Sequence, residues 1–180
     1  MQLTLIRHLP TVWNKNTWLQ GRKDIAISFL TESDKQKIEQ NLIVLNHLAP
    51  IDLVLASSLR RTQQTANAYG YQPEIDPLLD ELDFGPFEGE PREKLLALHG
   101  DAWINNPIEL VLGESVLDLG NRVCSFLEKY YDAGNILVFG HGCWIRALLS
   151  YFHYGHFNNM NRLTLLNNEC VTLEFLDNVK

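Results

Sequence analysis

Short apolar runs that alternate with stretches of helical periodicity are the feature that most constrains the fold of this chain. Three of these runs are LTLIRHLPT at 3–11, IDLVLASS at 51–58 and NILVFGHG at 135–142. Apolar runs of this length, closed by proline, serine or glycine, are typical of strands buried inside a parallel sheet. Parallel strands need crossover connections, which are usually helices. The alternation therefore predicts an α/β fold, a single three-layer domain with a mostly parallel central sheet and helices on both faces.

Helical patterns fill the intervals between the predicted strands. We expect helices at 31–48, from about Leu59 to Gly70, at 91–100, from Ser115 to about 132 and at 143–153, with loops at 10–30 and 74–91. Ser115 is the expected N-cap of its helix, because Asp118 follows three residues later. The alternating run ECVTLEFL at 169–176 predicts a fourth strand.

Size and composition indicate one ordinary globular domain over residues 1–180, since 46% of the residues are hydrophobic and 21% are charged. The net charge of -7 argues against nucleic acid or an anionic membrane as a partner, because such binding depends on clustered Lys and Arg. The three scattered cysteines predict neither a disulfide framework nor a zinc site. With no signal peptide and no run of about 20 apolar residues, we expect a cytoplasmic protein.

Cationic or imidazole side chains stand at the ends of all three strands; they are Arg7, His8, Arg60, Arg61 and His141. In open α/β sheets, ligands bind beyond the carboxyl ends of the strands. Arginine forks match phosphate oxygens, and the glycines on both sides of His141 allow backbone N–H groups to approach an anion. The pattern predicts a pocket for one phosphoryl group, and hence a small phosphorylated metabolite as the partner.

No carboxylate cluster suited to a metal ion is evident, so the cations themselves would have to stabilise the phosphoryl charge, with no metal and no cofactor. Hydrolysis of a phosphate ester also needs an acid that protonates the leaving oxygen. The acidic loop offers Glu81, Asp83 and Glu88 for this task.

These motifs, in this order, resemble the histidine phosphatase superfamily, the phosphoglycerate-mutase-like phosphatases. The family opens with Arg-His-Gly followed by Thr and Trp-Asn, and this chain has RHLPTVWN. The later motifs are matched by WLQGRKD, RTQQTA, LDELDFGPFEG, GES with Arg122, and the His141–Gly142 pair. The matches span nearly the whole chain, so the resemblance also implies the phosphoglycerate mutase-like fold.

The resemblance implies a role for each matched residue. His8 is the expected nucleophile, which becomes phosphohistidine, and Glu81 is the expected proton donor. The groups expected to bind the phosphoryl group or the substrate are Arg7, Arg61, His141, Asn14, Gln20, Thr11 and the backbone of Gly142. Arg60 is expected to be a solvated neighbour.

Two departures from the family pattern lie beside the nucleophile. Leu9 replaces the motif glycine, and Pro10 removes a backbone donor. A non-catalytic protein that binds a phosphorylated ligand therefore remains an alternative to an enzyme. Phosphoglycerate mutase-type transfer is a second alternative, although the short segment before GES offers little lid to keep a phosphohistidine dry.

The physiological ester is not determined by these motifs. ELDFGPFEG, followed by Trp103 and NNP, resembles the alpha-ribazole phosphatase branch of cobalamin biosynthesis, so alpha-ribazole 5'-phosphate is one candidate. Other chemistries lack support, because no cysteine is followed by the arginine of a cysteine phosphatase and no GxxxxGK occurs. A homodimer is compatible with the sequence, which does not settle the oligomeric state.

Overall fold

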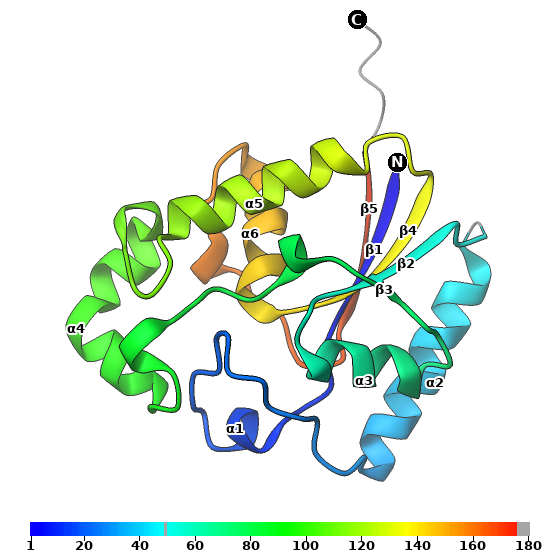
Figure 1. Cartoon of the computed structure of the whole chain (residues 1–180), viewed down its shortest axis with the longest axis horizontal. Helices are drawn as coiled ribbons and strands as arrows, with labels where there is room; N and C mark the ends of the chain where they lie inside the picture. Colours follow the sequence, from blue (N-terminus) through cyan, green and yellow to red (C-terminus); the bar gives the residue numbers. More distant parts are fainter. Residues whose placement is uncertain (49, 176–180) are drawn as a thin grey trace, which may run out of the picture.

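A five-stranded sheet forms the centre of the molecule. The structure, a computed structural model, describes residues 1–48 and 50–175. The strands follow the spatial order β3-β2-β4-β1-β5 (Figure 1). They are β1 (Gln2–Arg7), β2 (Leu53–Ala56), β3 (Glu74–Ile75), β4 (Asn135–Gly140) and β5 (Cys170–Glu174). The pairs β1–β4, β2–β4 and β2–β3 are parallel and β1–β5 is antiparallel, which confirms the predicted mostly parallel sheet.

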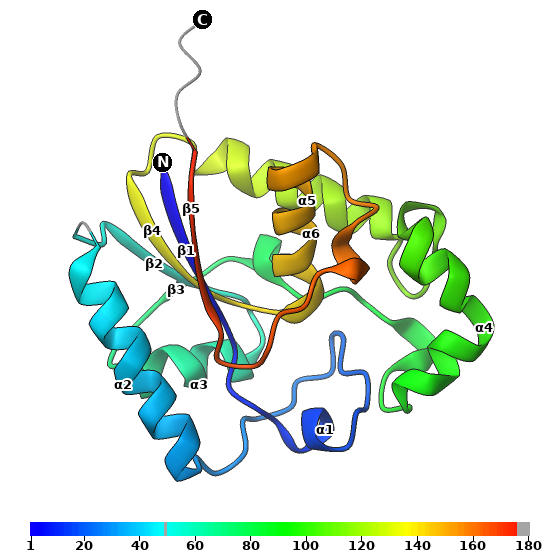
Figure 2. The ribbon, with the colours of Figure 1, turned by 180° about the vertical axis from the view of Figure 1, so that it is seen from behind.

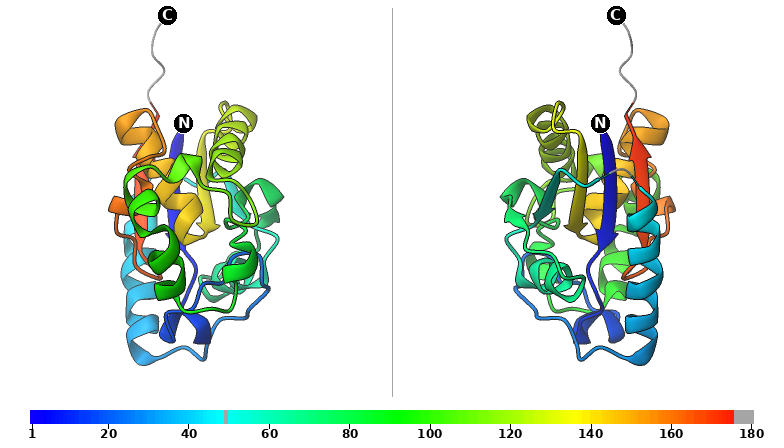
Figure 3. Two further views of the ribbon diagram at one scale, coloured as in Figure 1. Left: turned by 90° about the vertical axis from the view of Figure 1, so that its left-hand side faces the viewer. Right: turned by 90° about the vertical axis from the view of Figure 1, so that its right-hand side faces the viewer.

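Helices cover both faces of this sheet, as predicted (Figures 2 and 3). They are α1 (Val12–Lys15), α2 (Glu32–His47), α3 (Arg60–Ala68), α4 (Arg92–Asn105), α5 (Val116–Lys129) and α6 (Gly142–Tyr154). Side chains alternate between the faces of a strand, so β1 contributes to two separate cores. Leu3 and Leu5 pack with residues of α5 and α6, whereas Ile6 packs with residues of α2 and α3.

The helix caps explain where two of the helices begin. Ser115 accepts a hydrogen bond from the Asp118 N–H at 2.9 Å, which confirms the expected start of α5. Thr31 caps α2 in the same way and forms a capping box with Asp34. Such side chains satisfy backbone N–H groups that have no partner within the helix.

The predicted end of the fourth helix, at Gly100, is wrong, because α4 continues to Asn105. A glycine that closes a helix usually takes a positive φ, as Gly155 does at +72° after α6. Gly100 stays in the helical region, and a Cβ added there would meet nothing closer than 3.9 Å. Two short elements, β3 of two residues and α1 of four, were not predicted and lie in the predicted loops. Leu176, the last residue of the predicted fourth strand, lies outside the described residues.

None of the helices in the described ranges has the length and apolar character needed to cross a membrane. At the carboxyl ends of the parallel strands, α1, α4 and the loop that precedes β5 surround one region (Figure 1). This is the end of the sheet at which a ligand is expected in an α/β fold.

Candidate active site

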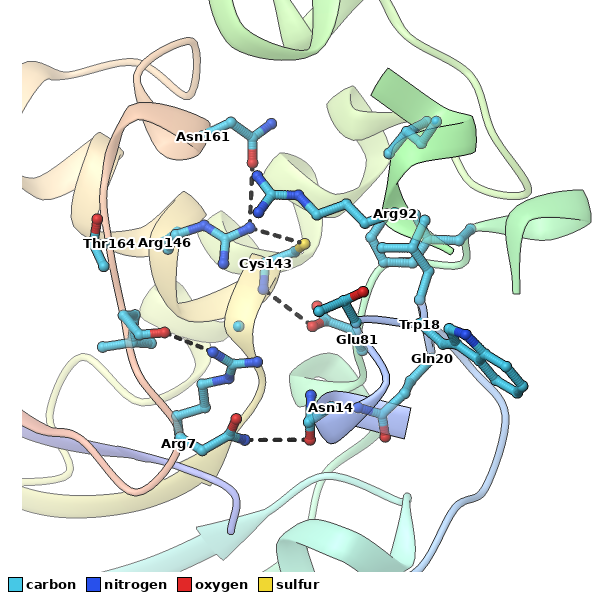
Figure 4. A pocket seen from close by; sticks show the side chains of 18 of the residues that line it. Arg7, Asn14, Trp18, Gln20, Glu81, Arg92, Cys143, Arg146, Asn161 and Thr164 are labelled. Carbon is cyan, nitrogen blue, oxygen red and sulfur yellow. Dashed lines mark hydrogen bonds between the residues drawn. The ribbon is translucent and has the colours of Figure 1, made fainter. Parts of the chain in front are cut away.

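A cavity of about 510 Å³ lies at the carboxyl end of the sheet, which is a usual size for a small-molecule site. Of the residues predicted from sequence, those that line it are Arg7, His8, Asn14, Gln20, Arg61, Glu81 and Gly142. Figure 4 labels four of them, Arg7, Asn14, Gln20 and Glu81. His141 and Thr11 are not lining residues, and both are fully buried behind the cavity wall. We call Arg7, His8, Arg61, Glu81 and His141 the inner pocket.

Strand register brings the two histidines of the inner pocket together. In the parallel pair of β1 and β4, Arg7 lies opposite Gly140, so the residues that follow, His8 and His141, leave the sheet side by side. Their ring centroids are 5.4 Å apart in an edge-to-face arrangement. Two positions separated by more than 130 residues in sequence thus meet at one point, as the strand-end pattern predicts.

The ring of His8 is oriented by its own chain. Its Nδ1 lies 2.8 Å from the carbonyl oxygen of Leu9, which can only accept, so Nδ1 carries the hydrogen. This tautomer leaves a lone pair on Nε2. Burial, together with the nearby Arg61 and Arg7, lowers the pKa of His8 well below its ordinary value. His8 is therefore neutral at pH 7, as a nucleophile must be.

Leu9 does not disturb this arrangement. Only Thr17 and Asn168, among the described non-glycine residues, have a positive φ, so Leu9 adopts an ordinary backbone conformation. Its side chain is fully buried in the core between the sheet and α2 and α3, and its N–H donates to Thr65 Oγ1 at 2.9 Å. Neither Leu9 nor Pro10 lines the cavity. The motif glycine is thus replaced without strain and without blocking the site.

Three nitrogen atoms of the inner pocket are buried without a hydrogen-bond partner. They are Arg7 Nε, Arg61 Nε and His141 Nδ1, and the only others within the described ranges are Arg22 Nε and Ser28 Oγ. Buried polar atoms without partners are uncommon and costly. Three such atoms around one histidine indicate a place for an anion that accepts several hydrogen bonds.

The two inner arginines stay charged although they are buried. Burial lowers the pKa of each to about 10, and the neighbouring Arg146 contributes to the shift at Arg7. Their Nη atoms are held by backbone carbonyls, Arg7 by Leu165 at 2.6 Å and Arg61 by Gly21 and Lys23 at 2.7 Å. These bonds orient the guanidinium groups, whereas the charges lack a carboxylate partner among the described ion pairs.

The ring of His141 is held by a residue that follows β2. Its Nε2 lies 2.7 Å from Ser57 Oγ at the end of β2, and burial lowers its pKa well below the ordinary value. Ser57 was missed in the sequence analysis. Its signal is the same as that of His8, a polar residue directly after a buried strand.

Glu81 binds the start of α6. Its carboxylate accepts hydrogen bonds from the N–H groups of Cys143 at 3.0 Å and Trp144 at 3.2 Å, and from Leu82 at 3.0 Å. These helical N–H groups have no partner within α6, and the helix dipole favours a carboxylate there. The sequence analysis assigned such N–H groups to the ligand, and two of them instead hold Glu81. Gly142, the first residue of α6, still lines the cavity.

The loop that carries Glu81 is fixed by α5 and α6. Arg122 donates to the carbonyl oxygens of Leu78 at 2.9 Å and Asp80 at 2.8 Å, and Trp144 Nε1 donates to Leu78 at 2.7 Å. Arg122 is itself paired with Glu114 at 2.7 Å. The GES motif and Arg122 therefore position the acidic residue without touching the cavity.

Thr11 positions two amides rather than contacting a ligand. Its backbone N–H donates to Asn14 Oδ1 at 3.0 Å, and its hydroxyl donates to Gln20 Oε1 at 3.0 Å. Because the carbonyl ends of both amides are occupied, their NH2 groups are the ends left to donate into the cavity. The predicted direct role of Thr11 in binding is replaced by this indirect one.

Several further residues of the cavity were not predicted from the sequence; they are Arg92, Arg146, Asn161, Arg162 and Asn167. Arg146 had a signal, since it lies four residues after Gly142 and so on the same face of α6. Asn167 donates to the carbonyl oxygen of His8 at 2.9 Å. It had no signal, because the loop before β5 reaches the cavity only in the folded chain.

Within the described residues, no group of three or more His, Cys, Asp or Glu side chains is placed to hold a metal ion. The positive charge in the inner pocket comes from Arg7 and Arg61. The site is thus a buried, cationic pocket built for a small anion, with a neutral imidazole at its floor and a carboxylate beside it.

Comparison with known proteins identifies the class to which this fold and site belong. The model of the histidine phosphatase superfamily, branch 1, matches residues 3–179. The chain therefore belongs to the histidine phosphatase superfamily, which confirms the resemblance and the fold inferred from the motifs.

Individual relatives differ in their names. "Probable phosphoglycerate mutase GpmB" of Yersinia enterocolitica is 31% identical over 83% of this chain and 74% of its own. "Putative phosphoserine phosphatase 2" of Hydrogenobacter thermophilus is 29% identical over 82% of this chain and 76% of its own. The alpha-ribazole phosphatase from Shigella flexneri shares the fold, with a TM-score of 0.79 at 24% identity, over 98% of this chain and 92% of that one.

Proposed function

We infer that this protein is a phosphomonoester hydrolase that needs no metal ion and acts on a small phosphorylated metabolite through a phosphohistidine on His8. The observation that carries this proposal is the set of unpartnered nitrogens, Arg7 Nε, Arg61 Nε and His141 Nδ1, around a neutral His8. Fixed donors such as the two guanidinium groups stabilise the charge that develops on a phosphoryl group in transfer.

The reaction proceeds in two transfers. In the first, His8 Nε2 attacks phosphorus, the N–P bond forms, the ester P–O bond breaks, and Glu81 gives its proton to the leaving oxygen. In the second, Glu81 takes a proton from water, the water oxygen attacks phosphorus, and the N–P bond breaks to release phosphate and restore His8. Dividing hydrolysis in this way replaces one difficult step by two easier ones.

The position of Glu81 suits both of its tasks. It lines the same cavity as His8, and its loop is fixed through Arg122 and Trp144. The N–H groups of Leu82, Cys143 and Trp144 hold the carboxylate in place, so the group that gives a proton to the leaving oxygen and then takes one from water keeps one position in both transfers.

The relaxed conformation of Leu9 supports an enzyme over a non-catalytic binding protein, because it leaves the His8 ring unobstructed. The rim of the cavity supports hydrolysis over mutase-type transfer. Arg92 and Arg162 on this rim are exposed, so water can reach a phosphohistidine, whereas a mutase must exclude it.

The substrate is a small phosphomonoester. Alpha-ribazole 5'-phosphate is one candidate, favoured by the resemblance of ELDFGPFEG and by Trp18, which lines the cavity and could stack on an aromatic base. Phosphoserine and phosphoglycerates are the candidates that the names of the relatives supply.

Hydrolysis of p-nitrophenyl phosphate tests the proposal. We expect turnover that chelator does not change, and a loss of at least about 10³-fold in kcat in His8→Ala. The matched control is His153→Ala, since His153 is exposed on α6 and does not line the cavity. Full activity in His8→Ala, or turnover that stops on chelation, would refute the mechanism.

A further inference from the structure

The cavity holds more positive charge than one phosphoryl group needs. Its charged lining residues are Arg7, Arg61, Arg92, Arg146 and Arg162 against Glu81 and Glu93. Five arginines against two ionised glutamates leave three positive charges when His8 is neutral, and four when Glu81 carries the proton for the first transfer. A phosphate dianion neutralises two, so at least one positive charge remains, within a chain whose net charge is -7.

The excess charge lies on one side of the cavity. We call Arg92, Arg146, Asn161 and Arg162 the outer wall, which is formed by α4, α6 and the loop before β5. Figure 4 shows Arg92 and Arg146 pointing toward the same part of the cavity beside Asn161. None of the three arginines pairs with a carboxylate in the described part of the chain.

The partners of Arg146 are all neutral. It donates to the Met160 carbonyl oxygen at 3.2 Å, to Asn161 Oδ1 at 3.2 Å and to Cys143 Sγ at 3.3 Å. Asn161 is held in turn by its bond to the Trp103 carbonyl oxygen at 2.9 Å. The side chain of Arg146 is therefore oriented, while its charge remains uncompensated.

Two of these arginines occupy unfavourable positions. A Cβ at Gly142 would lie 3.2 Å from Arg146 Nη1 and 3.3 Å from Arg7 Cζ, so both guanidinium groups crowd one backbone position. Arg92 is the first residue of α4, where the helix dipole disfavours a cation. An anion bound beside Arg92 and Arg146 offsets both of these unfavourable interactions.

We propose that the outer wall binds a carboxylate on the substrate, so that the substrate class is phosphorylated small acids rather than phosphorylated neutral alcohols or nucleosides. This inference rests on the proposed function, because it assumes that the phosphoryl group occupies the inner pocket. Arg92 and Arg146 contact the carboxylate, and Asn161 positions Arg146. A negative charge there offsets positive charge that the phosphoryl group leaves uncompensated.

Binding of two closely matched esters tests the proposal. 3-Phosphoglycerate and glycerol 3-phosphate differ at one carbon, which is a carboxylate in the first and a hydroxymethyl group in the second. In a His8→Ala background, which prevents turnover, calorimetry gives the Kd of each ester at one fixed salt concentration. We expect 3-phosphoglycerate to bind about tenfold more tightly, the effect of one charge-assisted contact.

Arg92→Gln and Arg146→Gln should each reduce this preference by about threefold or more. The ratio of the two Kd values cancels any common effect of Arg146 on the phosphoryl group. Lys94→Gln is the matched control, because Lys94 is exposed on the same helix, pairs with Glu90 at 2.6 Å and does not line the cavity. It should leave the ratio unchanged.

The binding measurements and the hydrolysis assay distinguish a failure of this inference from a failure of the proposed function. Equal affinities, or a ratio that Arg92→Gln and Arg146→Gln do not change, would overturn the carboxylate site even if p-nitrophenyl phosphate is hydrolysed. A clear preference for 3-phosphoglycerate that depends on both arginines would establish the site even if no ester is turned over.

Discussion

The inner pocket and the outer wall carry the same kind of charge but hold it in different ways. Arg61 of the inner pocket is fully buried and fixed by two backbone carbonyls, and Arg7 is fixed by one. Arg92 and Arg162 of the outer wall are exposed. Fixed and dehydrated charges suit the stabilisation of a transition state, whereas exposed ones contribute mainly to binding and selectivity. We therefore propose that the inner pocket carries out the chemistry and that the outer wall selects the substrate.

Among changes to the arginines of the cavity, the largest expected effect comes from removing a fixed charge of the inner pocket. Arg61→Gln should lower kcat for p-nitrophenyl phosphate by about 10²–10³-fold, the usual cost of losing one preorganised donor. Arg60→Gln is the matched control, because Arg60 is the adjacent residue but is exposed and bonded to Asp24 at 2.8 Å. Similar losses in both variants would place the effect in α3 as a whole rather than in the inner pocket.

Leu9 follows His8 in the sequence and packs in the core rather than in the inner pocket, so its replacement should change stability more than activity. Because its side chain is fully buried in the core, Leu9→Ala should destabilise the protein by about 2–5 kcal/mol in urea unfolding. The kcat of the folded variant should change by less than about threefold, since Leu9 does not line the cavity. A large gain in kcat would mean that the leucine restrains the nucleophile after all.

The buried histidines of the inner pocket, His8 and His141, should make the stability of the protein depend on pH. Their folded-state pKa values lie well below the ordinary value of about 6.5, so below pH 6.5 the unfolded chain binds protons that the folded protein does not. Stability should therefore fall as pH decreases from about 6.5, by up to about 1.4 kcal/mol per pH unit for each histidine, until the folded-state pKa is reached.

Urea unfolding at pH 7.5, 6.5 and 5.5 measures this slope. The double variant His8→Gln/His141→Gln should have a smaller slope, and the exposed His153→Gln should keep that of the parent. An identical slope in the parent and the double variant would show that other groups cause the pH dependence.

The smallest expected effect on the activity concerns Thr11, which is buried behind the cavity wall. Thr11→Val removes the hydroxyl that accepts from the Asn14 N–H and donates to Gln20 Oε1, so KM for p-nitrophenyl phosphate should rise by about tenfold with a smaller change in kcat. Thr31→Val is the control, because Thr31 forms the same type of capping box at the start of α2. Both variants should lose about 1 kcal/mol of stability, but only Thr11→Val should change KM.

The residues of the inner pocket could be predicted from the sequence better than those of the outer wall, for a physical reason. His8 and His141 each follow a buried strand directly, and parallel pairing of those strands brings their ends together. Arg92 reaches the cavity from α4 and Asn161 from the short 3-10 helix Met160–Arg162, whose positions depend on tertiary packing, so no local pattern marks them. The end of α4 was missed because Gly100 lies in the helical region, where a glycine does not end the helix.

Trapping the intermediate tests the central claim most directly. In Glu81→Gln, p-nitrophenyl phosphate can still transfer its phosphoryl group, because its leaving group needs little protonation, but water is no longer activated. After a rapid alkaline quench, peptide mapping by mass spectrometry should find an acid-labile phosphoryl group on His8. A phosphoryl group on another residue, or none on the protein while the ester is hydrolysed, would contradict the account.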